Sequence, residues 1–129
     1  MIVDDPKTRA EVEALFRDYE RALVTNDVAA LDRFFRDGAE TIRYGVAENL
    51  YGIEAIRAFR AGRSPVGLMR DLERTQITTY GKDFAIASTL FRRAGAPGKI
   101  GRQMQSWARL PEGWRIATLK SQMAFRRQA

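Results

Sequence analysis

The chain of 129 residues contains no cysteine and no histidine. Without cysteine there is no disulfide framework, no thiolate metal site and no cysteine nucleophile. Without histidine, the commonest general base at neutral pH and the usual zinc and non-haem iron ligand are missing, which excludes a Ser-His-Asp triad. We therefore expect no cofactor, and any chemistry must come from the other polar side chains or from bound water.

Long apolar runs are absent too. No stretch approaches the roughly 20 apolar residues that a membrane-spanning helix requires, and the acidic N-terminus MIVDDPKTRAEVE lacks the zones of a signal peptide. The composition, 45% apolar and 29% charged, is that of a globular protein of one domain. We expect a single cytoplasmic domain over residues 1–129, with a frayed tail at 125–129 and no membrane partner.

Charged residues are plentiful, and most of the basic ones are arginines. The net charge is +6, and 18 of the 22 basic residues are arginines. They are scattered along the chain rather than clustered, and no zinc finger, RRM or helix-turn-helix pattern accompanies them, so we expect no nucleic-acid partner. Because the planar guanidinium group binds carboxylates through two parallel hydrogen bonds, the composition favours a small anionic metabolite as partner.

The first part of the chain has helical spacing. Asp5-Pro6 is a typical N-cap followed by proline at the first helical position, and the helix should end near Thr25. Asn26-Asp27 should cap a second, shorter helix, with Gly38 just past its end. The two apolar stripes consist of Val12, Leu15, Phe16, Tyr19 and Leu23, and of Val28, Leu31, Phe34 and Phe35.

After Gly38 the apolar period changes from helical spacing to alternation. Residues 41–46 alternate as a strand, Tyr51-Gly52 is a turn, and residues 53–63 have the pattern of a third helix. Short turns then separate alternating strands, which we expect at residues 70–80, 84–93, 99–110 and 114–123. Strands at this spacing form an antiparallel meander, so the order of elements predicts an α+β fold with N-terminal helices packed on the sheet.

Several segments, in this order, resemble one family. They are Tyr19 to Leu23, Thr41 to Gly45, Glu48 to Gly52, Ala55 to Arg60, Thr78 to Gly81, Ile100 to Gln103 with Ser106-Trp107, and Pro111 to Ile116. Together they resemble the AtzH-like proteins, also known as the HpxZ group of oxalurate catabolism, within the SnoaL/NTF2-like, cystatin-like superfamily. The likeness runs from about residue 10 to residue 118.

This resemblance implies a cone: a strongly curved sheet wrapped around a long helix, with a pocket inside and a homodimer formed through the sheet. It implies a cofactor-free hydrolase of small carboxylated amides or ureas, since one characterised activity of the group is the decarboxylating amidohydrolysis of a carboxylated urea. It also implies that Tyr19 and Arg43 form the catalytic pair.

The residues themselves give independent reasons to examine this pair. Arg43 lies mid-strand on the face opposite Ile42 and Tyr44, and an arginine that faces a closed cavity is costly unless it pairs with an anion. That anion is either a substrate carboxylate or an internal acidic side chain. Tyr19 lies in the apolar stripe of the first helix, where it serves either as a core residue or as a hydroxyl donor projecting into the pocket.

Five further residues are candidates for substrate binding: Tyr44, Asn49, Arg60, Arg102 and Lys120. The pair Glu48-Asn49 follows the first strand and either reaches the mouth of the pocket or forms a turn. Arg57 and Arg60 should lie at the surface, with Arg60 near an entrance. One face of the strand expected at residues 99–110 carries Arg102, Met104 and Ser106 and the other Gln103, Gln105 and Trp107, and alternation does not decide which faces the helix. Trp107 and Trp114 are expected to be core or interface anchors.

Lys120 stands where the resemblance leads us to expect a histidine, so it either brings a cation into the pocket or lies at the sheet surface.

The residues and the resemblance together leave three candidate functions. The first is hydrolysis of a small carboxylated amide or urea, and the second is non-catalytic binding of a small ligand by an accessory protein. The third, proton transfer of the ketosteroid isomerase kind, requires a carboxylate base in an apolar pocket and fits the arginine content least.

Overall fold

A computed structural model describes residues 1–125, with only the backbone described for Phe125. Most of the predicted frayed tail, residues 126–129, therefore lies outside the described residues. The chain forms α1 (Pro6–Thr25), α2 (Val28–Phe34), β1 (Ile42–Tyr44), β2 (Asn49–Tyr51), α3 (Ile53–Ala61), β3 (Asp71–Tyr80), β4 (Phe84–Arg92), β5 (Lys99–Leu110) and β6 (Gly113–Phe125). The predicted α+β order of helices followed by a strand meander is confirmed.

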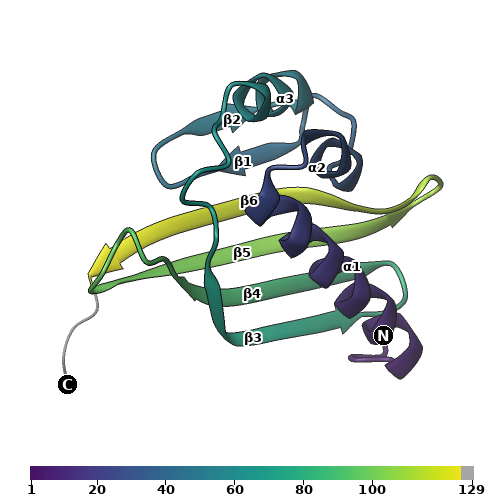
Figure 1. Cartoon of the computed structure of the whole chain (residues 1–129). Coiled ribbons are helices and arrows are strands. Elements are labelled where there is room, and N and C mark those ends of the chain that lie inside the picture. Colours follow the sequence, from purple (N-terminus) through teal and green to yellow (C-terminus); the bar gives the residue numbers. More distant parts are fainter. Residues whose placement is uncertain (126–129) are drawn as a thin grey trace.

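The strands form one sheet in the order β2-β1-β6-β5-β4-β3, and α1 lies across its inner face (Figure 1). All neighbouring strands are antiparallel except β1 and β6, which pair in parallel through Ile42–Thr118, Arg43–Leu119 and Tyr44–Lys120. Bulges interrupt the ladders between Glu73 and Gln76 and between Ser106 and Trp107. Because a bulge bends its strand and increases the local twist, these irregularities help the long strands to curve around α1.

The core lies between α1 and the sheet. The Asp5 carboxylate accepts a hydrogen bond of 3.1 Å from the backbone of Thr8, which caps α1 as the sequence predicts. Trp107, fully buried, and Trp114 belong to this core, as expected. Its other large members are Val12, Phe16, Tyr19, Leu23, Leu31, Phe35, Ile53, Ile56, Ile77, Ile116 and Leu119.

Three local predictions were wrong. Residues 45–48 form a turn, so the first strand ends at Tyr44, and β2 occupies residues where only a turn was expected. Helix α2 stops at Phe34, because Phe35 is extended and pairs with Ile116, so Gly38 is not its C-cap. The four long strands form the predicted antiparallel meander, and the added strand β1 pairs in parallel with β6.

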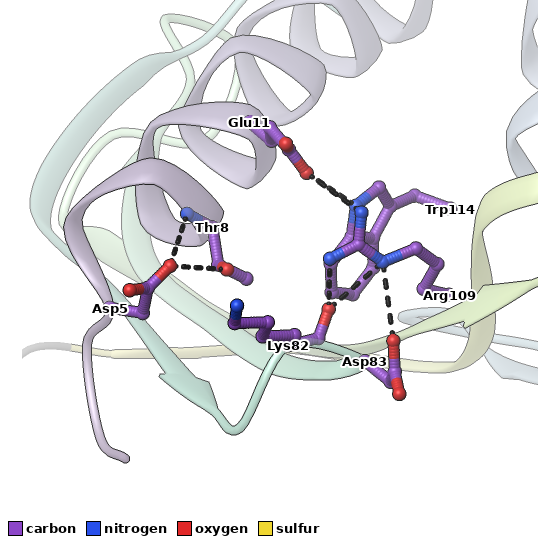
Figure 2. Close-up of polar contacts among 7 residues, drawn as sticks. All are labelled: Asp5, Thr8, Glu11, Lys82, Asp83, Arg109 and Trp114. Atoms are coloured by element: carbon purple, nitrogen blue, oxygen red, sulfur yellow. Dashed lines mark hydrogen bonds and ion pairs between the residues drawn. The ribbon is translucent and has the colours of Figure 1, made fainter.

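Arg109 joins the far end of the sheet to α1 (Figure 2). Its guanidinium group donates to the backbone carbonyl of Lys82 and lies 3.3 Å from both the Asp83 and the Glu11 carboxylates. It also stacks on the ring of Trp114, at 5.1 Å from the centroid. The Arg109 side chain thus connects the turn after β3 and the strands β5 and β6 to α1, and this holds α1 in place over the sheet.

None of the helices within residues 1–125 combines the length and apolar character that crossing a bilayer demands.

Candidate functional site

A cavity of about 160 Å³ lies between the C-terminal half of α1, the β1–β2 turn, the end of α3 and the inner face of the sheet. It is small beside the roughly 300–1,000 Å³ of pockets that hold drug-sized ligands. Its lining consists of Tyr19, Leu23, Arg43, Val46, Ala47, Glu48, Phe59, Arg63, Leu68, Arg70, Phe91, Arg93, Gln103 and Ser121. The predicted pair, Tyr19 and Arg43, therefore meets at one cavity.

Tyr19 reaches the cavity from the buried stripe of α1. Only 1% of the residue is exposed, and its ring packs edge-on against Phe34 and at a tilt against Phe35. Within residues 1–125 its hydroxyl makes no hydrogen bond. It lies near the guanidinium groups of Arg60 and Arg63, whose pKa is lowered chiefly by burial, and Tyr19 opposes that lowering only in part. The hydroxyl is thus available to a ligand as a donor.

Arg43 points inward from β1, as alternation predicts, and is 6% exposed. Its Nη1 atom donates a hydrogen bond of 2.6 Å to the Oε1 atom of Glu48, and its guanidinium group lies 5.1 Å from the centroid of the Phe59 ring. Of the two partners considered from the sequence, an internal acidic side chain is the one found here. Glu48 folds back over the β1–β2 turn, where the backbone N–H of Gly45 donates to the Glu48 carbonyl at 2.8 Å.

Arg70 is the second cavity arginine with a carboxylate partner. Its side chain is almost fully buried and forms two hydrogen bonds of 2.7 Å to the two oxygens of Glu20. It also donates at 3.1 Å to Oε1 of Gln103, an oxygen that accepts a further bond from Ser121. Gln103 is thereby oriented with its buried Nε2 donor unpaired within residues 1–125.

Arg63 and Arg93 also line the cavity, and no carboxylate in residues 1–125 lies within ion-pair distance of either. The buried Nε and Nη2 atoms of Arg63 and the Nε atom of Arg93 have no hydrogen-bond partner in this part of the chain. Burial, and then the nearby charge of Arg43, lower the pKa of Arg63; burial and Arg70 do the same to the pKa of Arg93. Two partly buried guanidinium groups therefore have no ion-pair partner in residues 1–125, although Glu48 acts on Arg63 and Glu20 on Arg93 from a greater distance.

Two aromatic rings each contact two of the four arginines that line the cavity. Arg43 and Arg63 both lie over the Phe59 ring, at 5.1 and 5.2 Å from its centroid. Arg70 and Arg93 lie over Phe91, at 4.5 and 4.9 Å. Each ring face attracts cations, which makes it less costly to hold two guanidinium groups near each other. Sequence reasoning missed Arg63, Arg70, Arg93 and Gln103, although Arg92-Arg93 was visible as one of two adjacent arginine pairs.

The other five candidates do not line this cavity. Arg102 and Lys120 project from the outer face of the sheet, since their neighbours Gln103 and Leu119 are the buried, inward ones. Tyr44 faces outward as well, and its hydroxyl meets that of Tyr51 at 3.2 Å. Asn49 is exposed on β2, so its amide does not reach the cavity. The inner face of β5 therefore carries Gln103, Gln105 and Trp107.

Arg60 departs furthest from expectation. It was expected at the surface near an entrance, yet it is fully buried behind the cavity, stacked 4.2 Å from the centroid of Phe35. Asp32 lies 3.5 Å away without a hydrogen bond, and three guanidinium nitrogens lack a partner in residues 1–125. This burial lowers the pKa of Arg60 to about 10. The helical turn that places Ile53 and Ile56 in the core places Arg60 there too.

The acidic side chains offer no metal centre, because no three of them come together in the part of the chain that the structure describes.

The sequence model of the AtzH-like family matches residues 1–125. The chain belongs to the AtzH-like family. No curated protein matches it.

Two solved structures are similar along almost their whole length. A protein of unknown function from the DUF3225 family of Pectobacterium atrosepticum is 53% identical, with a TM-score of 0.92 and coverage of 95% of this chain and 94% of that one. A cystatin-like fold protein from Burkholderia xenovorans is 46% identical, with a TM-score of 0.94 and coverage of 98% and 99%.

More distant structural neighbours confirm the NTF2-like, cystatin-like fold. An NTF2-like protein of unknown function from Pseudomonas putida is 15% identical with a TM-score of 0.77, covering 95% of this chain and 90% of that one. Neighbours at 14% identity include proteins provisionally described as a ketosteroid isomerase and as a dehydratase of the NTF2-like family. At such identity the likeness concerns the fold alone, a fold on which enzymes are described.

Proposed function

We propose that this AtzH-like protein hydrolyses a small carboxylated amide or urea without a metal or organic cofactor. The observation that supports this most is the surplus of positive charge around a small cavity. Four arginines line it, and within residues 1–125 only Arg43 and Arg70 have a carboxylate partner. A guanidinium group that is partly removed from water is stabilised by a nearby anion. Because Arg63 and Arg93 are partly buried and have no ion-pair partner in residues 1–125, they favour an anionic ligand.

The donors in the cavity suit the rest of such a molecule. The guanidinium groups of Arg63 and Arg93 bind the carboxylate, and the unpaired Nε2 atom of Gln103 donates to an amide or urea oxygen. The Tyr19 hydroxyl donates to the carbonyl oxygen that is attacked, and Arg43 stabilises the negative charge that develops there. Donors fixed in place before the reaction stabilise a developing oxyanion without reorganising.

Non-catalytic binding is the second candidate function. It is favoured by the same cavity, because a set of fixed donors binds a carboxylate whether or not a bond is then cleaved. The roles proposed for Tyr19 and Arg43 are those of hydrogen-bond donors, so neither role removes a proton from water. Binding alone therefore requires nothing beyond the residues already described.

Consumption of the ligand separates the two functions. Purified protein is incubated with oxamate, oxalurate and N-carbamoylglycine, and the loss of each compound is followed by mass spectrometry alongside its effect on the melting temperature. Hydrolysis predicts that at least one compound is consumed, and that Tyr19→Phe and Arg43→Gln each slow this by 100-fold or more while the fold persists. Stabilisation by a compound that is never consumed would support the binding function instead.

A further inference from the structure

Hydrolysis by the proposed route lacks one group, a proton acceptor for the attacking water. Arg43 and the Tyr19 hydroxyl are both assigned as hydrogen-bond donors, and a guanidinium group has no acceptor atom. Among the described residues that line the cavity, Glu48 is the only one with a carboxylate. Neither the predicted pair nor the proposed function gives it a role.

Glu48 is held over the cavity from several sides. Its Oε1 atom accepts the bond of 2.6 Å from Arg43, and its Oε2 atom accepts a bond of 3.2 Å from the backbone of Ala47. Each carboxylate oxygen can accept more than one hydrogen bond, so both retain capacity for a water. With 23% of the side chain exposed, the carboxylate lies where solvent meets the cavity.

The position of the Glu48 carboxylate beside Arg43 depends on the glycine at residue 45. A Cβ atom built on Gly45 would overlap the Glu48 carboxylate and approach Nη1 of Arg43 to 2.8 Å. The absence of a side chain at Gly45 therefore lets Glu48 fold back onto Arg43. Glu20, the other acidic partner of a cavity arginine, differs: Arg70 occupies both of its oxygens, and it does not line the cavity.

We propose that Glu48 is the general base of the hydrolysis, a role that rests on the proposed function. Glu48 takes a proton from water as the water oxygen bonds to the carbonyl carbon, and the carbonyl oxygen becomes an oxyanion bound by Tyr19. The C–N bond then breaks, and the proton passes from Glu48 to the leaving nitrogen. The products are a carboxylic acid and an amine or amide when an amide is cleaved, or a carbamic acid and an amine when a urea is cleaved, and Glu48 returns to its carboxylate form.

Glu48→Gln tests this role, because it keeps the size of the side chain and an oxygen for Arg43 but is not a base. With oxalurate as substrate, we expect turnover to fall by roughly 100-fold to 10,000-fold. The Kd for oxalurate should be no weaker than that of the wild type, since a negative charge beside an anion site has been removed.

Glu48→Ala with added formate gives a readout that a purely structural role would not produce. The truncation leaves space beside Arg43 for a small carboxylate, so formate should restore turnover in a concentration-dependent manner. Formate should have no such effect on Tyr19→Phe, which lacks a donor rather than a base.

Gly45→Ala tests the position of the carboxylate without changing its chemistry. The added methyl group displaces Glu48 from Arg43, so turnover should fall as it does in Glu48→Ala. Gly95→Ala is the matched control, because a Cβ there would meet nothing within 4 Å. It should keep wild-type turnover.

Failure of the role proposed for Glu48 and failure of the proposed function give different experimental results. If the wild type consumes oxalurate and Glu48→Gln stays within threefold of it, with no effect of formate on Glu48→Ala, then Glu48 is only the counter-ion of Arg43 and the role as base is wrong. If the wild type consumes none of oxamate, oxalurate and N-carbamoylglycine, the proposed function itself fails, and the role of Glu48 fails with it.

Discussion

Arginines that are chemically identical have very different environments in this molecule. Arg21 is exposed and pairs with Asp18 on the same helix, whereas Arg60 is fully buried without a hydrogen bond among the described residues. The charge of Arg60 is therefore a cost to the folded state rather than a source of stability. Stacking on Phe35 and the proximity of Asp32 offset that cost only in part.

Arg60→Met combined with Asp32→Leu should accordingly stabilise the protein. Methionine keeps the contact with Phe35, and Asp32 is replaced as well because its Oδ1 atom is buried beside Arg60 and would otherwise be left as an unpaired charge. We expect the free energy of unfolding to rise by about 1–4 kcal/mol, as when other buried ion pairs are replaced by apolar residues. Chemical denaturation at neutral pH measures this, with the exposed Arg17→Met as control. A less stable double variant would contradict the assignment.

The way in which the free energy of unfolding changes with pH explains why it is measured at neutral pH. Burial lowers the pKa of Arg60 to about 10 in the folded protein, below the value of an unperturbed arginine. Between these values the unfolded chain binds the proton that the folded protein has lost, so stability rises with pH only in that range. Below pH 10 the guanidinium group is charged in both states, and its burial cost is fully present.

At the scale of elements, the junction of α1 and α3 sets the geometry of the cavity. Asn26 ends α1 in the left-handed conformation, with φ 48° and ψ 49°. Its side-chain amide donates to the carbonyl oxygens of Arg63 at 2.8 Å and Arg60 at 3.4 Å. One residue thus joins the helix that carries Tyr19 to the segment that carries Arg63.

Asn26→Gly should loosen Arg63 without disturbing the end of α1, because glycine adopts the left-handed conformation freely. Loss of the two hydrogen bonds should weaken oxalurate binding by roughly threefold to tenfold. Calorimetry measures the change. Thr25→Ala is the control, since its hydroxyl bonds only within α1, to Arg21 and Ala22. Equal Kd values for Asn26→Gly and the wild type would show that Asn26 does not position Arg63.

The long elements were predictable because each repeats its own period several times. The span of α1 follows from its cap and apolar stripe, and β5 has the predicted bounds. The three-residue strands β1 and β2 carry too little alternation to reveal their ends. The parallel pairing of β1 with β6 joins residues more than 70 positions apart, so no local pattern indicates it.

At the scale of the whole molecule, the cavity was predictable only in part. Resemblance identified Tyr19 and Arg43, and both line it. Arg63 and Arg93 lie at the ends of different elements, and the fold alone brings them together around Phe59 and Phe91. The homodimer through the sheet stays a prediction. The outer face offers exposed Met104 and Phe84 for it, beside Arg102 and Lys120.

The central claim is that unpaired guanidinium groups hold the carboxylate of a small ligand. The most direct measurement is the Kd of oxalurate by isothermal titration calorimetry, for the wild type, for Arg63→Gln combined with Arg93→Gln, and for the exposed control Arg17→Gln. Because charge-assisted hydrogen bonds contribute about 1.5–3 kcal/mol each, the double variant should bind at least 10-fold more weakly, while the control matches the wild type. Equal Kd values for the double variant and the wild type would contradict the claim.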